Sequence, residues 1–127
     1  MSDNQELNLN SKKIYIVEDD VFLGQILSQR IAAETTSLTL FKNGEDALAA
    51  IIQNVPDIVV LDIFLPGMDG FKVLENMKLN DNTKSIPVLV VSNANEADKA
   101  KSMGVEFLLK ALTTPDEIVE KVKSMLG

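Results

Sequence analysis

Acidic, hydroxyl and amine side chains directly follow four short apolar runs of this sequence. They are Glu18 and Asp19 after residues 14–17, Asp62 after 58–61, Ser92 after 88–91 and Lys110 after 107–109. Carboxylates that meet in space repel one another, and a hard divalent cation such as Mg²⁺ compensates directly because it prefers oxygen ligands. A carboxylate in such a place can attack phosphorus, while a lysine and a hydroxyl stabilise the charge of the phosphoryl oxygens. The pattern therefore indicates phosphoryl-transfer chemistry.

Two absences narrow the chemistry further, because the chain contains no cysteine and no histidine. Without cysteine there is no disulfide, no thiol nucleophile and no cysteine-based zinc site. Without histidine there is no Ser-His-Asp triad, no histidine general base and no HExxH metal helix. Any reaction must therefore rest on carboxylates, lysines or hydroxyls, with or without an oxygen-ligated metal.

The formal net charge is −7, from 19 acidic and 12 basic residues. This balance argues against a general nucleic-acid binder or a protein that binds anionic membranes, since both need a basic patch. It is compatible with a divalent cation or a basic partner surface, and also with a charge that only keeps the protein soluble.

The length of 127 residues accommodates one domain and a short tail. Residues 1–12 are polar and lack the apolar core of a signal peptide, so we expect a disordered tail there and one domain over residues 13–127. No stretch approaches 18 apolar residues. We therefore expect no membrane-spanning segment and a cytoplasmic protein.

Short apolar runs alternate with segments of helical periodicity along the whole domain. The runs are Ile14–Val17, Leu38–Phe41, Ile58–Leu61, Val88–Val91 and Phe107–Leu109. Three of them are continuous and rich in β-branched residues, which is typical of parallel strands buried on both faces. Alternating strands and helices predict an α/β fold, a doubly wound parallel sheet of five βα units with helices on both faces and right-handed crossovers.

Helix-start signals mark several of the segments between the runs. The clearest is Thr114-Pro115-Asp116-Glu117, where a capping box coincides with proline at the first helical position. Asp20 and Asp69 are expected to cap the helices that follow them. In open α/β sheets, ligands bind outside the carboxyl ends of the strands, so the residues that follow the apolar runs form the candidate site.

The sequence resembles a receiver domain of the two-component response regulators from about Lys13 to Leu126. The matching stretches, in the expected order at the expected strand ends, are Ile14–Asp20, Pro56–Gly70, Ile86–Ser92 and Leu108–Lys110. The second stretch is the most specific. The resemblance implies a single-domain, CheY-like fold of flavodoxin type, with five parallel strands in the order 2-1-3-4-5.

The resemblance also implies a metal site. Glu18 and Asp19 match the acidic pair that holds Mg²⁺, with Asp19 as a direct ligand and Glu18 acting partly through water. Asp62 and the backbone carbonyl of Phe64 complete the protein ligands, and Mn²⁺ could substitute for Mg²⁺.

Four residues match the positions that carry the phosphoryl group and the response to it. Asp62 matches the phosphoacceptor, Lys110 the lysine that ion-pairs with the phosphoryl group, and Ser92 the switch hydroxyl that hydrogen-bonds it. Phe107 matches the aromatic residue that changes rotamer on activation. Simpler roles stay open for Ser92 as a helix cap and for Phe107 as a core residue.

The function that this resemblance implies is a phosphorylation switch. A partner histidine kinase or histidine phosphotransfer protein would donate a phosphoryl group to Asp62 in an Mg²⁺-dependent transfer. The new charge would alter a face made of the fourth helix, fifth strand and fifth helix, which would bind a downstream protein target. Phosphorylation and dephosphorylation would be self-catalysed without an independent substrate, so we expect a signalling protein, not an enzyme. We expect a monomer or weak dimer with no direct contact to nucleic acid or membrane.

Three positions depart from the family pattern. Ala111 follows Lys110 where proline is usual, so we expect a trans peptide there, since a non-proline cis bond costs about 2.5–4 kcal/mol. Asn93 follows Ser92 where a smaller residue is usual, at a position that controls access to the phosphoryl group. The candidate fourth helix, roughly Asn95–Met103, is short and polar, and we expect it to be the most mobile element.

Two other functions compete with the switch. A phosphohydrolase that uses an aspartyl-phosphate typically needs an acid two residues after its nucleophile, and Phe64 stands there instead. A receiver-like binding module without phosphotransfer is the other alternative, and Ala111 and Asn93 are the features that favour it.

Overall fold

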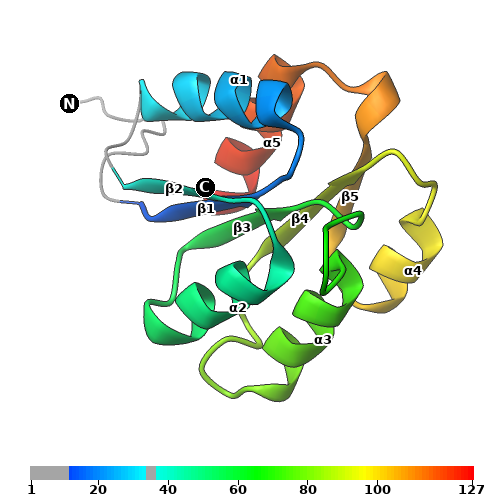
Figure 1. Cartoon of the computed structure of the whole chain (residues 1–127). Helices are drawn as coiled ribbons and strands as arrows, with labels where there is room; N and C mark the ends of the chain where they lie inside the picture. Colours follow the sequence, from blue (N-terminus) through cyan, green and yellow to red (C-terminus); the bar gives the residue numbers. More distant parts are fainter. Residues whose placement is uncertain (1–11, 34–36) are drawn as a thin grey trace.

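Five parallel strands form one sheet, as the apolar runs predict (Figure 1). The computed structural model describes residues 12–33 and 37–127, so the predicted tail lies outside the described residues except for Lys12. The strands lie in the order β2-β1-β3-β4-β5, which confirms the predicted order. They are β1 (Ile14–Val17), β2 (Leu38–Phe41), β3 (Ile58–Leu61), β4 (Val88–Ser92) and β5 (Glu106–Leu109).

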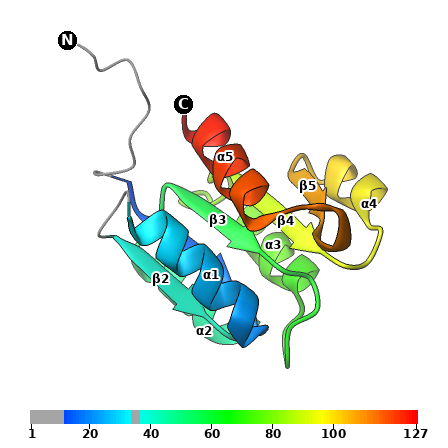
Figure 2. The same ribbon diagram turned by 90° about the horizontal axis from the view of Figure 1, so that it is seen from above.

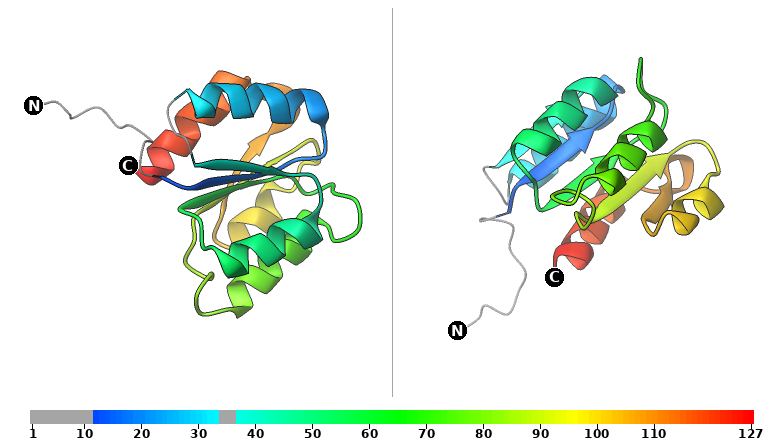
Figure 3. Two further views of the ribbon diagram at one scale, coloured as in Figure 1. Left: turned by 60° about the vertical axis from the view of Figure 1, so that its left-hand side comes forward. Right: turned by 90° about the horizontal axis from the view of Figure 1, so that it is seen from below.

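Helices cover both faces of the sheet, which confirms the doubly wound architecture (Figures 2 and 3). One face carries the first and last helices, and the other carries the three in between. They are α1 (Val21–Ala32), α2 (Gly44–Gln53), α3 (Gly70–Leu79), α4 (Ala97–Ser102) and α5 (Pro115–Leu126), with a 3₁₀ turn, η1 (Lys110–Leu112), after β5.

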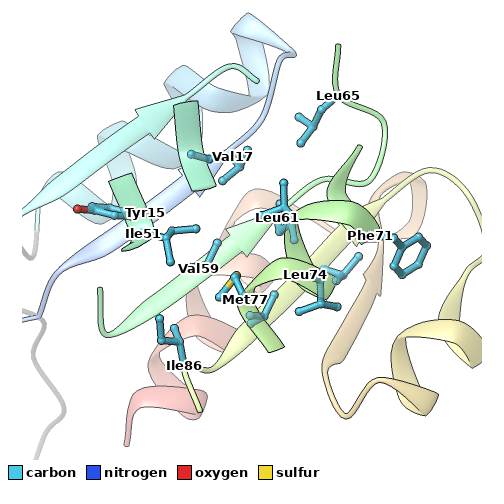
Figure 4. Close-up of a cluster of buried hydrophobic side chains, with 14 of the residues drawn as sticks. Tyr15, Val17, Ile51, Val59, Leu61, Leu65, Phe71, Leu74, Met77 and Ile86 are labelled. Carbon is cyan, nitrogen blue, oxygen red and sulfur yellow. The ribbon is translucent and has the colours of Figure 1, made fainter. Parts of the chain in front are cut away.

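The central strands are buried on both faces because successive side chains enter two different cores. Val59 and Leu61 of β3 join the core under α2 and α3, which Figure 4 shows. Ile58 and Val60 join the core under α1 and α5. The edge strand β2 is only partly buried, which explains why its sequence lacks the continuous β-branched run of β1, β3 and β4.

Polar caps fix the starts of the helices where the sequence predicts them. The Asp20 carboxylate accepts hydrogen bonds from the backbone N–H groups of Phe22 and Leu23 at the start of α1. Asp69 accepts from the N–H of Lys72 in α3, and the capping box of Thr114 opens α5. Because all five strands are parallel, the loops that lead from each strand to the next helix lie along one edge of the sheet.

The structure refines the predicted elements near the fourth and fifth strands. Ser92 is the last residue of β4 and is not a helix cap, and β5 begins one residue earlier than predicted. No peptide bond in the described part of the chain is cis, so the Lys110–Ala111 bond is trans as expected. The fourth helix is short, as predicted, and its N-terminus has no side-chain cap. Among the described residues, no helix is both long and apolar enough to cross a membrane.

Candidate functional site

The sheet register brings the first and third strand ends together. Val17 of β1 pairs with Leu61 of β3, so the next residues, Glu18 and Asp62, follow side by side. The backbone N–H of Asp62 donates to the carbonyl oxygen of Val17 at 3.0 Å, and that of Glu18 donates to Phe41 of β2 at 2.9 Å. The backbones that carry the two carboxylates are therefore fixed by the sheet.

Lys110, which follows the edge strand β5, joins these two carboxylates at the same end of the sheet. Its Nζ lies 2.9 Å from Oε1 of Glu18 and 3.1 Å from Oδ2 of Asp62. Both acidic side chains are only 4% exposed and the lysine side chain is 16% exposed. A buried charge without a partner is costly, so this bridged triad is the main source of charge compensation at the site.

Burial and charge perturb the titration of Glu18 and Lys110. Burial raises the pKa of Glu18 to about 7, and the negative charge of Asp62 adds to the effect, against hydrogen bonds from the Asp20 N–H and Lys110. Burial opposes the charged form of Lys110, but its hydrogen bond to Glu18 and the two carboxylate charges outweigh burial and raise its pKa. The lysine therefore stays charged, whereas Glu18 exchanges its proton near neutral pH.

Glu18, Asp19 and Asp62 form a candidate cation site. Each offers one carboxylate oxygen, and these oxygens all lie within 4.8 Å of one another. Glu18 and Asp62 are buried while Asp19 is exposed, so one side of the cluster is open to solvent. The cluster holds three carboxyl groups against one lysine, and an all-oxygen donor set suits Mg²⁺ or Mn²⁺. The donors fit the cation that the sequence predicts.

The loop between β3 and α3 folds back on Asp62. The N–H of Phe64 donates to Oδ1 of Asp62 at 3.3 Å, and the N–H of Gly70 donates to the carbonyl of Ile63 at 2.8 Å. A Cβ atom at Gly70 would lie 2.2 Å from the carbonyl oxygen of Asp62, so only glycine permits this approach. Phe64 is 60% exposed, and its backbone N–H is the group that contacts Asp62.

Ser92 and Phe107 occupy the last two strands. Ser92 is fully buried at the end of β4, and its Oγ accepts a hydrogen bond from the N–H of Ala94 at 3.3 Å. It pairs in register with Leu109, the residue before Lys110, which brings it to the same edge of the sheet. Phe107 is half-buried in β5 and packs against the core under α2 and α3. Asn93 is exposed beside Ser92.

The loop between β3 and α3 makes one contact that the sequence does not predict. Oε2 of Glu45 in α2 accepts a hydrogen bond from the N–H of Met68 at 3.0 Å. No spacing rule relates an acid at the start of one helix to a loop 23 residues later. The contact depends on how α2 packs beside α3 and could not be read from the sequence.

Similarity to known proteins agrees with this geometry. The sequence profile of the response regulator receiver domain matches residues 14–123. The transcriptional regulatory protein BaeR of Escherichia coli O6:H1 is 31% identical over 121 residues, which cover 92% of this chain and 49% of BaeR. The chain spans about a quarter to a half of the length of such curated relatives.

Solved structures share the same architecture. A putative response regulator from Chloroflexus aurantiacus J-10-fl has a TM-score of 0.80 at 28% identity, covering 91% of this chain and 97% of that one. The phosphorylated cyanobacterial phytochrome response regulator RcpA has a TM-score of 0.75 at 26% identity, covering 90% of each chain. With the strand order and the profile match over nearly the whole described domain, this chain belongs to the response regulator receiver domain family.

Proposed function

We propose that Asp62 accepts a phosphoryl group from a partner phosphohistidine and that the chain acts as a two-component signalling switch. The observation that carries the proposal is the bridge of Lys110 between Glu18 and Asp62 beside the open, acidic end of the sheet. A lysine held at the carboxylate is in place to neutralise a phosphoryl group bonded there.

The transfer requires a nucleophile, charge stabilisation and little else. A carboxylate oxygen of Asp62 forms the new P–O bond as the P–N bond of the donor phosphohistidine breaks. The electron pair of that bond stays on the imidazole nitrogen, which takes up a proton from solvent. Lys110 forms an ion pair with the phosphoryl oxygens after the transfer, and the hydroxyl of Ser92 donates a hydrogen bond to one of them. Hydrolysis of the aspartyl-phosphate resets the switch.

Glu18, Asp19, Asp62 and the backbone carbonyl of Phe64 are the groups we assign to Mg²⁺, with Mn²⁺ as a substitute. When bound, the cation supplies positive charge to the phosphoryl oxygens during transfer. Before it binds, Lys110 compensates part of the carboxylate charge. Asp19, the exposed member, gives the cation its access from solvent.

The phosphohistidine donor and the downstream target lie outside this sequence. The chain has no histidine, so the phosphohistidine must belong to a histidine kinase or histidine phosphotransfer protein. We assign the response to Ser92 and Phe107, which pass the change at Asp62 to the face formed by α4, β5 and α5. That face would bind the downstream protein target, in a shift between two pre-existing states.

Labelling with a small phosphodonor tests the proposal without knowledge of the kinase. With Mg²⁺ present, acetyl phosphate should add one phosphoryl group, which intact mass detects. Beryllofluoride, which mimics a bound phosphoryl group, should change the spectrum under the same conditions. EDTA should prevent both effects. Asp62→Asn should abolish labelling. Asp57→Asn, at the opposite end of β3 where the carboxylate accepts from the Lys13 N–H, should label like the parent chain.

Two results would replace the proposal with a competing function. Absence of any modification or spectral change would leave a receiver-like binding module without phosphotransfer. Steady release of phosphate from general phosphomonoesters would instead indicate an aspartyl-phosphate phosphohydrolase.

A further inference from the structure

The loop that follows Asp62 rests against the N-terminal end of α2. Besides the hydrogen bond from the Met68 N–H to Glu45, the backbones themselves are in close contact. A Cβ atom at Gly44 would lie 2.2 Å from the carbonyl oxygen of Met68. A Cβ atom at Gly67 would lie 2.5 Å from Oε2 of Glu45. At Gly44 the helix and loop backbones therefore meet without room for an additional carbon atom, whereas at Gly67 the nearest atoms are the end of the Glu45 side chain.

The conformation of Gly67 explains how the loop presents an N–H to Glu45. Its φ of +73° lies in the left-handed region, which favours glycine. The chain turns there, and the next N–H, that of Met68, donates to the carboxylate at 3.0 Å. A hydrogen bond to an ionised acceptor is stronger than one between neutral groups, so Glu45 is a better anchor than an uncharged side chain.

The anchored loop is the one that carries a proposed metal ligand. Hydrogen bonds hold both ends of the loop beside Asp62. The Phe64 N–H donates to Oδ1 of Asp62, and the Gly70 N–H donates to the carbonyl of Ile63. Glu45 supplies a third tie from a different element, since α2 and α3 lie side by side (Figure 1). The position of the Phe64 carbonyl therefore depends on how this loop is held.

We infer that Glu45 is a positioning residue, which clamps the β3–α3 loop and so preorganises the Phe64 carbonyl for the cation. The inference rests on the proposed phosphoacceptor function. Glu45 acts through Met68 and Gly67 and does not itself touch the reacting atoms. Its role is to reduce the ordering that the loop must undergo when the cation binds.

Three variants separate this role from a general effect on folding. Glu45→Ala removes the clamp, Glu45→Gln keeps an oxygen acceptor, and Asp46→Ala removes the same charge from the next residue. The Asp46 carboxylate accepts instead from the amide of Asn43, so this variant is a matched control. Each variant is compared with the parent chain of 127 residues.

The first measurement is amide hydrogen exchange by NMR in the metal-free protein. The Met68 amide should exchange roughly tenfold faster in Glu45→Ala, and Glu45→Gln should restore much of the protection. The second is Mg²⁺ titration. The dissociation constant should rise by roughly tenfold in Glu45→Ala, at the low end of what loss of a supporting contact costs a metal site. Asp46→Ala should leave both values at parent level.

A substitution at Gly67 gives an independent check of the contact. Gly67→Ala adds a carbon atom against Glu45 as well as strain at positive φ, so it should weaken Mg²⁺ binding more in the parent than in the Glu45→Ala background. Parent-like exchange and Mg²⁺ affinity in Glu45→Ala would overturn the inference while leaving the proposed function intact. A parent chain that neither binds Mg²⁺ nor labels would overturn the proposed function itself.

Discussion

The stability of the metal-free protein should fall as the pH rises through neutrality, and Glu18 should be the cause. The pKa of this carboxyl in the folded protein is about 7, against an ordinary value of 4.5, because the side chain is buried. Between these values the folded state binds more protons than the unfolded state, so raising the pH favours unfolding. The stabilising contribution is complete below the ordinary value and is lost as the pH passes about 7.

The size of the effect follows from the two values. Proton linkage gives a loss of about 2 kcal/mol in the free energy of unfolding between about pH 5.5 and pH 8. For a chain of this length, that corresponds to a fall in melting temperature of about 8 °C. The window is unusually clean because the chain has no histidine, the side chain that normally titrates there.

Differential scanning calorimetry in EDTA measures how steeply the melting temperature falls with pH across this range. Glu18→Gln should flatten it, since the amide does not titrate. Glu120→Gln removes an exposed carboxylate from α5 and should retain the parent slope. A slope that survives in Glu18→Gln would refute the assignment to this carboxyl, and a parent chain with no slope would refute the effect of burial.

Three further predictions concern the same edge of the sheet. Lys110→Met leaves two buried carboxylates without their counterion and should lower the free energy of unfolding at alkaline pH by about 3 kcal/mol in urea titrations; an unchanged midpoint would contradict the bridge. Mg²⁺ at about ten times its dissociation constant should add about 1.4 kcal/mol at the same pH, and EDTA should reverse the gain; equal gain in Asp62→Asn would place the ion elsewhere. Amides of the uncapped helix α4 should exchange fast in the free chain and more slowly with beryllofluoride; equal protection in both states would rule out ordering on phosphorylation.

Local sequence signals were sufficient where the structure depends on neighbouring residues. The β-branched runs at Ile14–Val17 and Ile58–Leu61 form the buried strands they predict, because only a strand covered on both faces accommodates them. The caps at Asp20, Asp69 and Thr114 form because each satisfies N–H groups two or three residues away. The parallel strands also predict that the carboxylates which follow them lie at one edge of the sheet.

Local sequence signals could not predict contacts between elements that are far apart in the sequence. Lys110 pairs with Glu18 as well as with Asp62, an ion pair that spans 92 residues of sequence and follows from the strand order. The contact of Glu45 with Met68 depends on the spacing between two helices. The 3₁₀ turn over Lys110–Leu112 has no helix-forming pattern, and it forms where β5 must turn towards α5.

The short hydrogen bond between Gly70 and Ile63 makes the intervening segment a closed loop whose two ends meet. The two ends of this loop are fixed, because the residues just after β3 lie next to the first residue of α3. A segment exchanged for residues 64–69 must therefore keep Gly67, whose φ is +73°, and the Asp69 cap of α3 if the backbone of Asp62 is to stay fixed. Changes at the other positions of this loop can then alter the surroundings of Asp62 without rebuilding the sheet beneath it.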